Sequence, residues 1–321
     1  MNKTIRILIP DDLPQECINI FKSADFEVIF NPTMPAEEIL KAVKDVDGMV
    51  VRSKVKVTRE VIENGNRLKL IGRAGVGYDN IDVAAATEKG IAVMNVPGAN
   101  AVSVAELTLA MMLILARNLI EANDTTKAGK WEKKRLKGNE LMGKTLGLFG
   151  LGMVGVEVAK RAIGFGMKVI ANDPKFVSDS DVPFNVKIVE LDELLTQSDY
   201  ISLHLPLNEE THHMINDEAL AKCKKGVRII NCARGGIIDE MALYKAVQSG
   251  QVAGAALDVF ENEPPKDSPL RELPNIIMTP HIGASTLEAQ IRVATKVARQ
   301  MVAFFKEEKV ENVVNPEAIL K

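Results

Sequence analysis

The sequence predicts an α/β fold made of two doubly wound parallel-sheet domains. Short Val- and Ile-rich runs alternate with helical patterns along the chain, and this alternation favours parallel sheets that carry helices on both faces. Pro97 and Gly98 interrupt the alternation within NVPGANA (95–101), where we place a hinge. With 321 residues, 46% of them apolar, the chain is long enough for two hydrophobic cores.

The first domain is expected to open with a strand at TIRILIP (4–10) and a helix over residues 14–22. The next strands are FEVIF (26–30), DGMVV (47–51), LKLIG (68–72) and IAVMNV (91–96), separated by helical patterns. A long helix should follow the hinge. Ser103 and Glu106 form the S-x-x-E pattern of a capping box ahead of the apolar run VAELTLAMMLILA (104–116).

A second alternating series begins after residue 144. Its strand candidates are TLGLFG (145–150), MKVIAND (167–173), YISLHLP (200–206), VRIINCA (227–233), AGAALDV (253–259) and NIIMTP (275–280). An amphipathic helix over about residues 286–306 closes the chain.

Composition excludes several classes of protein. The net charge is −3, and the one basic run is WEKKRLK (131–137), which disfavours broad binding to nucleic acids or membranes. Cys17, Cys223 and Cys232 form no C-x-x-C pair, so we expect free thiols and no metal site. The most apolar helix candidate is too short to span a bilayer, so we expect a cytoplasmic protein.

Three glycines in GLFGLGMVG indicate a dinucleotide site. Gly150, Gly152 and Gly155 fit G-x-G-x-x-G between a strand and a helix, and Asp173 ends the next strand 23 positions after Gly150. The first glycine permits a tight turn, the second lets a pyrophosphate approach the backbone, and the third permits close packing. Asp173 would bind the ribose hydroxyls and repel the extra phosphate of NADP, which favours NAD; alternatively, it only starts a turn.

Three polar residues follow later strands. Arg234, Glu263 and His281 come after the fourth, fifth and sixth strand candidates of the second series, and ligands of open α/β sheets lie at carboxyl ends of strands. An arginine can clamp an α-carboxylate, and a histidine can exchange the hydroxyl proton that accompanies hydride transfer to a 2-oxo acid. A neighbouring carboxylate would raise the histidine pKa. Singly, each residue is more often a surface or packing residue, and the joint position carries the prediction.

The chain resembles the D-isomer-specific 2-hydroxyacid dehydrogenases, most closely the catalytic portion of members that act on D-3-phosphoglycerate. The resemblance covers nearly the whole chain. It rests on GRAGVGYDNID, NVPGANAVSVAELTLAMMLILAR, GLFGLGMVG, NCARGGIIDE, AALDVFENEPP and PHIGAST, in that order.

The resemblance implies roles for matched positions. His281 and Glu263 would be the acid/base pair, and Arg234 would bind substrate. The implied NAD contacts are Val76, Met153, Val154, Asp173, Leu205, Cys232, Asp258, His281, Ile282 and Gly283. The implied substrate contacts are Arg52, Ser53, Arg73, Gly75, Val76, Gly77, Asn100 and Arg234, with Arg52 and Arg73 as candidate phosphate partners.

The resemblance also implies a Rossmann NAD-binding domain, residues 99–282, inserted into a flavodoxin-like substrate domain, residues 1–98 plus 283–321. It implies a homodimer or homotetramer, with residues 131–137 near the dimer arm. Many members continue into a C-terminal domain that binds serine, and we expect no serine feedback by that route here.

The expected function is NAD-dependent oxidation of D-3-phosphoglycerate, as in serine biosynthesis. A reductase of glyoxylate, hydroxypyruvate or a sulfolactate-type acid is the alternative within the family. An NAD-sensing corepressor-like interaction protein is the alternative from another class, and a turnover assay would discriminate it.

Overall fold

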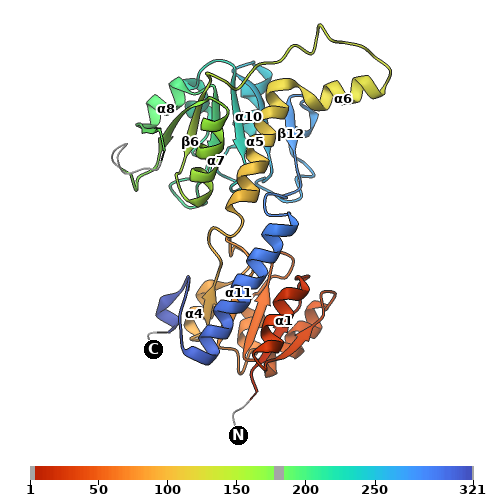
Figure 1. Cartoon of the computed structure of the whole chain (residues 1–321), viewed down its shortest axis with the longest axis vertical. Helices are drawn as coiled ribbons and strands as arrows, with labels where there is room; N and C mark the ends of the chain where they lie inside the picture. Colours follow the sequence, from red (N-terminus) through yellow and green to blue (C-terminus); the bar gives the residue numbers. More distant parts are fainter. Residues whose placement is uncertain (1–3, 177–183, 320–321) are drawn as a thin grey trace. The chain divides into compact units, whose positions relative to one another are not determined.

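The computed structural model describes residues 4–176 and 184–319. The chain forms two compact units, one of Met1–Asn100 with Ser285–Lys321 and one of Ala101–Ala284 (Figure 1). The sequence places the boundaries at 98/99 and 282/283, so each observed boundary lies two residues farther along the chain. One unit is therefore continuous in sequence and the other is assembled from both ends of the chain.

The first unit holds a five-stranded sheet in which all pairs are parallel. Its strands are β1 (Arg6–Ile9), β2 (Glu27–Phe30), β3 (Gly48–Val51), β4 (Leu70–Arg73) and β5 (Ala92–Met94), in the order β2-β1-β3-β4-β5. Its helices include α1 (Gln15–Ser23), α2 (Ala36–Ala42), α3 (Arg59–Asn64) and α4 (Val83–Glu88). This is the strand order of flavodoxin-like folds.

The last helix, α11 (Leu287–Glu307), completes the first unit by packing against α1 and β4 (Figure 1). Gly72 lets the helix lie close to the sheet, because a Cβ at that position would be 2.4 Å from the sulfur of Met301. Val297 and Met301 are fully buried there. Thr286 caps the helix by accepting a hydrogen bond from the amide of Ala289.

The second unit holds a seven-stranded parallel sheet. Its strands are β6 (Thr145–Phe149), β7 (Lys168–Asn172), β8 (Val186–Ile188), β9 (Tyr200–Leu203), β10 (Val227–Asn231), β11 (Val252–Leu257) and β12 (Ile276–Met278), in the order β12-β11-β10-β9-β6-β7-β8. Its helices are α5 (Ala101–Arg117), α6 (Leu119–Lys127), α7 (Met153–Gly164), α8 (Leu191–Gln197), α9 (Asp217–Lys222) and α10 (Glu240–Gln248).

This order is the doubly wound Rossmann arrangement with β12 added at one edge. The chain order reverses between β6 and β9, and such a switch point leaves a crevice at the carboxyl ends of the two strands. Separate apolar clusters cover the two faces of the sheet, one including Phe149 and Leu257 and the other including Leu148 and Ala256. The predicted fold class of two doubly wound α/β domains is therefore confirmed.

The predicted capping box at the start of α5 is wrong. The helix already begins at Ala101, so Ser103 lies in its first turn, and the Ser103 hydroxyl donates to the Gly283 carbonyl at 2.7 Å. Glu106 instead lies 3.4 Å from Arg161 of α7. The serine serves a tertiary contact, which a local sequence pattern cannot distinguish from a cap.

Among residues 4–176 and 184–319, no single helix is long and apolar enough to cross a membrane. The pair α5 and α6 passes that test only together, and the two helices are bent by 62° at their junction.

Candidate functional site

The glycine loop between β6 and α7 has the shape that a pyrophosphate site requires. Gly150 has φ +92°, a conformation that glycine adopts without strain. A Cβ at Gly155 would lie 2.1 Å from the Gly150 carbonyl oxygen, so this position needs hydrogen there. Gly152 caps α7, and a Cβ there would have no atom within 4 Å. The N-terminal end of α7 is thus open to an approaching anion.

Asp173 follows β7 and is tied to this loop. Its Oδ2 accepts from the amide of Leu151 at 2.7 Å, and its Oδ1 accepts from the amide of Lys175 at 2.9 Å. The residue is 9% exposed. Asp173 therefore holds the loop in place and also brings a negative charge to the carboxyl edge of the sheet.

His204 was not singled out from the sequence, although it lies directly beside the glycine loop. It follows β9, its amide donates to the Phe149 carbonyl, and its own carbonyl oxygen lies 2.8 Å from where a Gly150 Cβ would be. Its Nε2 is 2.9 Å from the Ser202 hydroxyl. Burial lowers the pKa of His204 to about 4, so its ring is neutral at pH 7. The strand-end rule that indicated His281 would also have found it.

His281 and Glu263 form a hydrogen-bonded pair. His281 Nδ1 lies 2.8 Å from Glu263 Oε2, while Oε1 accepts from the Phe260 amide at 3.3 Å. Burial alone would raise the pKa of Glu263, but the hydrogen bond and charge of His281 outweigh it and hold that pKa below its usual value. The hydrogen bond to Glu263 raises the pKa of His281, against an opposing effect of burial. Since an ionised carboxylate only accepts, Nδ1 carries the hydrogen and Nε2 faces away from Glu263.

The turn that carries His281 is anchored by Asp258. This carboxylate is 1% exposed at the end of β11, and it accepts from the Thr279 hydroxyl at 2.5 Å and from the Ile282 and Gly283 amides at 2.8 and 2.7 Å. His281 itself has φ +53°, which is uncommon outside glycine. Asp258 thus fixes the backbone on both sides of His281. Its predicted contact with the cofactor stays a prediction.

Arg234 follows β10, and its charge reaches the same pair. Asn231 shapes the turn, because its side chain donates to the Arg234 carbonyl at 2.8 Å and accepts from the Ala233 amide at 3.0 Å. The positive charge of Arg234 lowers the pKa of both Glu263 and His281. The structure therefore brings together the three residues that the sequence predicts at the ends of β10, β11 and β12.

The other predicted cofactor positions in this unit also lie at strand ends or on the glycine loop. Met153 and Ile282 are exposed, and Cys232 is buried with its Sγ 3.5 Å from the sulfur of Met111. Burial raises the pKa of the Cys232 thiol to about 12, so the thiol stays protonated at neutral pH. The remaining two positions are Val154, in the first turn of α7, and Leu205, two residues after β9.

The predicted substrate residues belong to the first unit, apart from Arg234. Arg52 and Ser53 follow β3, and Arg73 is the last residue of β4. Asn80 donates to the Arg52 carbonyl at 2.9 Å and so helps to shape this strand end. The remaining positions are Gly75, Val76 and Gly77, in the loop after β4, and Asn100, which ends the first segment of the unit.

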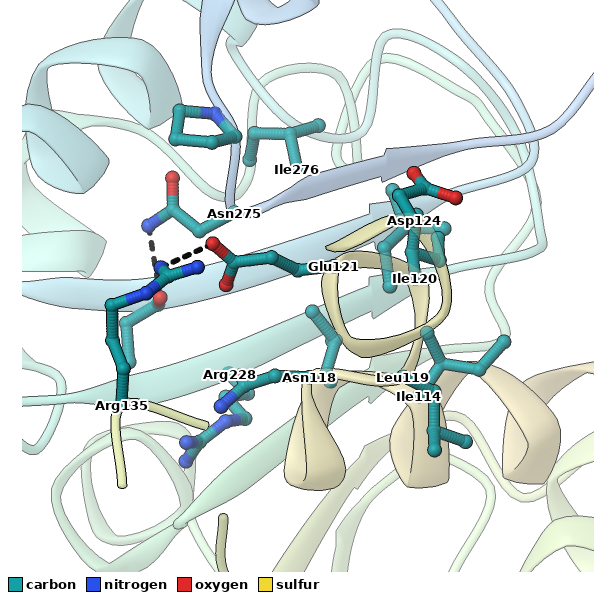
Figure 2. Close-up of a pocket in the computed structure, with 14 residues that line it drawn as sticks. Ile114, Asn118, Leu119, Ile120, Glu121, Asp124, Arg135, Arg228, Asn275 and Ile276 are labelled. Carbon is teal, nitrogen blue, oxygen red and sulfur yellow. Dashed lines mark hydrogen bonds and ion pairs between the residues drawn. The ribbon is translucent and has the colours of Figure 1, made fainter. Parts of the chain in front are cut away.

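A cavity of about 520 Å³ lies elsewhere in the second unit, between α5, α6 and the edge strand β12 (Figure 2). Leu119 and Ile120 contribute apolar side chains to it, and Arg135 and Glu121 pair across it. None of the predicted site residues lines it. In the described part of the chain, no group of three or more His, Cys, Asp or Glu side chains is placed to hold a metal ion.

The family of D-isomer specific 2-hydroxyacid dehydrogenases matches this chain. The model of its NAD binding domain covers residues 109–283. The D-3-phosphoglycerate dehydrogenase of Methanocaldococcus jannaschii is 51% identical over 97% of this chain, which spans 59% of that relative's length. The hydroxypyruvate reductase of Thermotoga maritima is 52% identical over 94% of this chain and 98% of the relative.

A solved structure shows the same architecture. The NAD⁺-bound 3-phosphoglycerate dehydrogenase of Entamoeba histolytica superposes with a TM-score of 0.82 at 33% identity, over 98% of this chain and 99% of that one. Sequence identity and fold agree along nearly the full chain. This chain therefore belongs to the D-isomer specific 2-hydroxyacid dehydrogenase family.

Proposed function

We propose that this chain is an NAD-dependent dehydrogenase that interconverts D-3-phosphoglycerate and its 2-oxo acid. The observation that carries the proposal is the His281–Glu263 pair under the charge of Arg234, at the carboxyl ends of neighbouring strands of a dinucleotide-binding sheet. Reduction of a 2-oxo acid needs a group that donates a proton and a group that binds the substrate carboxylate. His281 would supply the first and Arg234 the second.

The glycine loop fits NAD. The open position at Gly152, the close packing at Gly155 and the carboxylate at the end of β7 are the features that a dinucleotide with free ribose hydroxyls needs. When bound, NAD supplies the hydride acceptor for the C2 hydrogen of the hydroxy acid. Asp173 binds the adenosine ribose and disfavours NADP by charge repulsion.

The proton moves at His281 Nε2. Because Nδ1–H is directed to Glu263, the neutral ring presents the lone pair of Nε2 to the substrate hydroxyl and takes its proton during oxidation. In the reverse direction the doubly protonated ring returns that proton to the carbonyl oxygen. Glu263 stabilises this cation and fixes the ring orientation.

Arg234 binds the α-carboxylate of the substrate. Its planar guanidinium can hold the two carboxylate oxygens with parallel hydrogen bonds and draw electron density from the adjacent carbonyl. Arg52 and Arg73, at the ends of β3 and β4, are proposed to bind the phosphate, and Ser53, Asn100 and the Gly75–Gly77 backbone to contact the rest of the substrate. We propose that this activity serves serine biosynthesis.

A reductase of hydroxypyruvate or glyoxylate is the second candidate. Its support is the 52% identity to a hydroxypyruvate reductase that this chain covers almost completely. The distal group of the substrate separates the two candidates, because only a phosphate would need the charges of Arg52 and Arg73.

Steady-state rates with NADH and 3-phosphohydroxypyruvate, hydroxypyruvate and glyoxylate test the proposal. We expect the highest kcat/KM for 3-phosphohydroxypyruvate, and we expect the double variant Arg52→Ala/Arg73→Ala to lose that preference. Equal or higher kcat/KM for hydroxypyruvate would assign the second candidate. His281→Ala should lose turnover by about 10²–10⁴-fold while NADH still binds, and a chain that turns over none of these acids would contradict both candidates.

We also propose that the chain is a cytoplasmic homo-oligomer, a dimer or tetramer. Buried free thiols at Cys17, Cys223 and Cys232 support a reducing compartment. The helix α6 buries none of its own side chains and exposes Leu119 and Ile120, which supports burial against a second copy. Figure 1 shows α6 and the segment after it extending away from the body of the second unit.

A further inference from the structure

Four histidines occur in the chain, and one of them forms a second pair with a carboxylate beside the proposed catalytic pair. His213 Nε2 lies 3.1 Å from Glu261 Oε1. Glu261 is two residues before Glu263, in the same loop after β11. The two histidine–carboxylate pairs therefore hold neighbouring points of one loop.

Glu261 is also fixed to the start of α10. Its amide donates to Glu240 Oε1 at 2.8 Å, and the Glu240 amide donates to Glu261 Oε1 at 3.1 Å. The Ser268 hydroxyl donates to Glu240 Oε2 at 2.6 Å. Glu240 and Glu261 thus each accept a hydrogen bond from the other's backbone amide, and His213 adds a further contact to the Glu261 carboxylate.

His213 joins this cluster to the loop that carries Arg234. Its amide donates to the Gly236 carbonyl at 2.8 Å, its φ is +49°, and its ring stacks on that of His212 with centroids 4.0 Å apart. One residue therefore contacts the Gly236 backbone with its amide and Glu261 with its side chain. Its conformation is uncommon outside glycine, so the fold specifies it strongly.

The backbone held by this cluster directly supports the proposed catalytic residues. The Phe260 amide donates to Glu263 Oε1, and the Phe260 carbonyl oxygen lies 1.8 Å from where a Gly235 Cβ would be. A shift of residues 260–261 would therefore displace both Glu263 and the turn of Arg234. Packed interiors transmit such shifts because they hold few voids.

We propose that His213 is a positioning residue, which acts through Glu261 to hold Glu263 against His281. The inference rests on the proposed function only for its effect on turnover. It predicts that removal of the His213 side chain loosens the Glu263–His281 hydrogen bond without touching substrate or cofactor.

The test compares His213→Ala with His213→Gln and with the matched control His212→Ala. A glutamine can still donate to Glu261, and His212 has no contact with that carboxylate among the interactions of the described residues. In His213→Ala we expect kcat to fall about tenfold with the NADH dissociation constant unchanged. In the same variant, the pH at which the reduction rate falls on the alkaline side should move lower. We expect His213→Gln to recover most of the parent kcat and pH profile, and His212→Ala to match the parent in both.

NMR titration of the histidine rings gives a readout that needs no turnover. The pKa of the His281 ring should fall in His213→Ala, because its hydrogen bond to Glu263 weakens, and it should stay at the parent value in His212→Ala. An unchanged His281 pKa, or a lower kcat with an unmoved pH limb, would overturn the proposal. If His213→Ala does not fold, Glu261→Gln decides by the same titration. A parent protein that reduces no 2-oxo acid would contradict the proposed function and leave this titration decisive.

Discussion

At the scale of single residues, the surroundings of His281 give its two ring nitrogens different roles. Glu263 occupies Nδ1, and Asp258 fixes the turn on both sides of the ring through Thr279, Ile282 and Gly283. A ring that is oriented in this way loses little freedom when substrate arrives, which favours catalysis. The half-exposed side chain leaves Nε2 able to meet a ligand.

The pH dependence of reduction should report the His281–Glu263 hydrogen bond. The ring must be protonated to donate, so the rate falls as pH rises through the His281 pKa, which Glu263 raises above 6.5. Glu263→Gln removes the largest cause of that rise, so the falling limb should move to lower pH. A profile of kcat/KM against pH, with 3-phosphohydroxypyruvate and NADH, measures it. An unmoved limb would refute the role of Glu263.

Asp173 offers a matched pair of variants for cofactor choice. Asp173→Asn removes the charge but keeps an acceptor for the Leu151 amide, whereas Asp173→Ala leaves that buried amide without its partner. We expect Asn to raise the NADPH/NADH ratio of kcat/KM and to keep the fold. We expect Ala also to lower the unfolding free energy by about 1–3 kcal/mol. Equal cofactor ratios in Asn and parent would remove the ribose assignment.

Single site residues were predictable from the sequence where a side chain suited to acid/base chemistry or carboxylate binding follows a strand. Arg234, Glu263 and His281 each follow a Val-, Ile- or Ala-rich strand, so their convergence could be inferred without coordinates. The anchoring contacts of Asp258 with the turn of His281, and of His213 with Glu261, could not. These hydrogen bonds join residues 21 or more positions apart, and no local pattern encodes such pairs.

At the scale of elements, the junction of β6 and α7 depends on one close approach. The helix begins immediately after the glycine loop, and Gly155 in its first turn faces the Gly150 carbonyl. Any side chain there must push the helix away from the loop. The proposed anion site at the N-terminal end of α7 and the packing of that helix are therefore coupled.

Gly155→Ala should lower the unfolding free energy by about 1–3 kcal/mol through this collision, and it should weaken NADH binding. Gly164→Ala is the control, because it lies in the same helix and a Cβ there would have no atom within 4 Å. We expect that control to match or exceed the parent in stability. Urea denaturation and NADH fluorescence titration measure both effects. Equal losses in the two variants would contradict the packing argument.

Elements were predictable where strands are long and apolar, and less so at their margins. The six strand candidates of the second series all form strands, since buried parallel strands appear as continuous Val- and Ile-rich runs. The strand β8 was missed, because the exposed Lys187 interrupts VKI at 186–188 and leaves no continuous apolar run. The start of α5 was misplaced because Ser103 makes a contact with Gly283, 180 positions away.

At the scale of the whole molecule, the proposed self-association can be tested on α6. Leu119 and Ile120 are each 48% exposed and adjoin the 520 Å³ cavity of Figure 2. We expect Leu119→Asp/Ile120→Asp to shift the protein to monomers in sedimentation velocity. Met142→Asp is the control, because this residue is 69% exposed and lies outside that cavity. A double variant that sediments like the parent would exclude α6 from the interface.

The two-part composition of the first unit has a consequence for synthesis on the ribosome. The strands of its sheet lie within residues 1–100, but the helix that covers Gly72 and fills the core with Met301 follows the whole second unit in the chain. The continuous unit, residues 101–284, emerges in between with every strand of its own sheet. The second unit can therefore fold before the first unit is complete, whereas N-terminal domains usually fold first during synthesis. Until residues 287–307 emerge from the ribosome, the apolar face of the sheet around Gly72 lacks the helix that covers it.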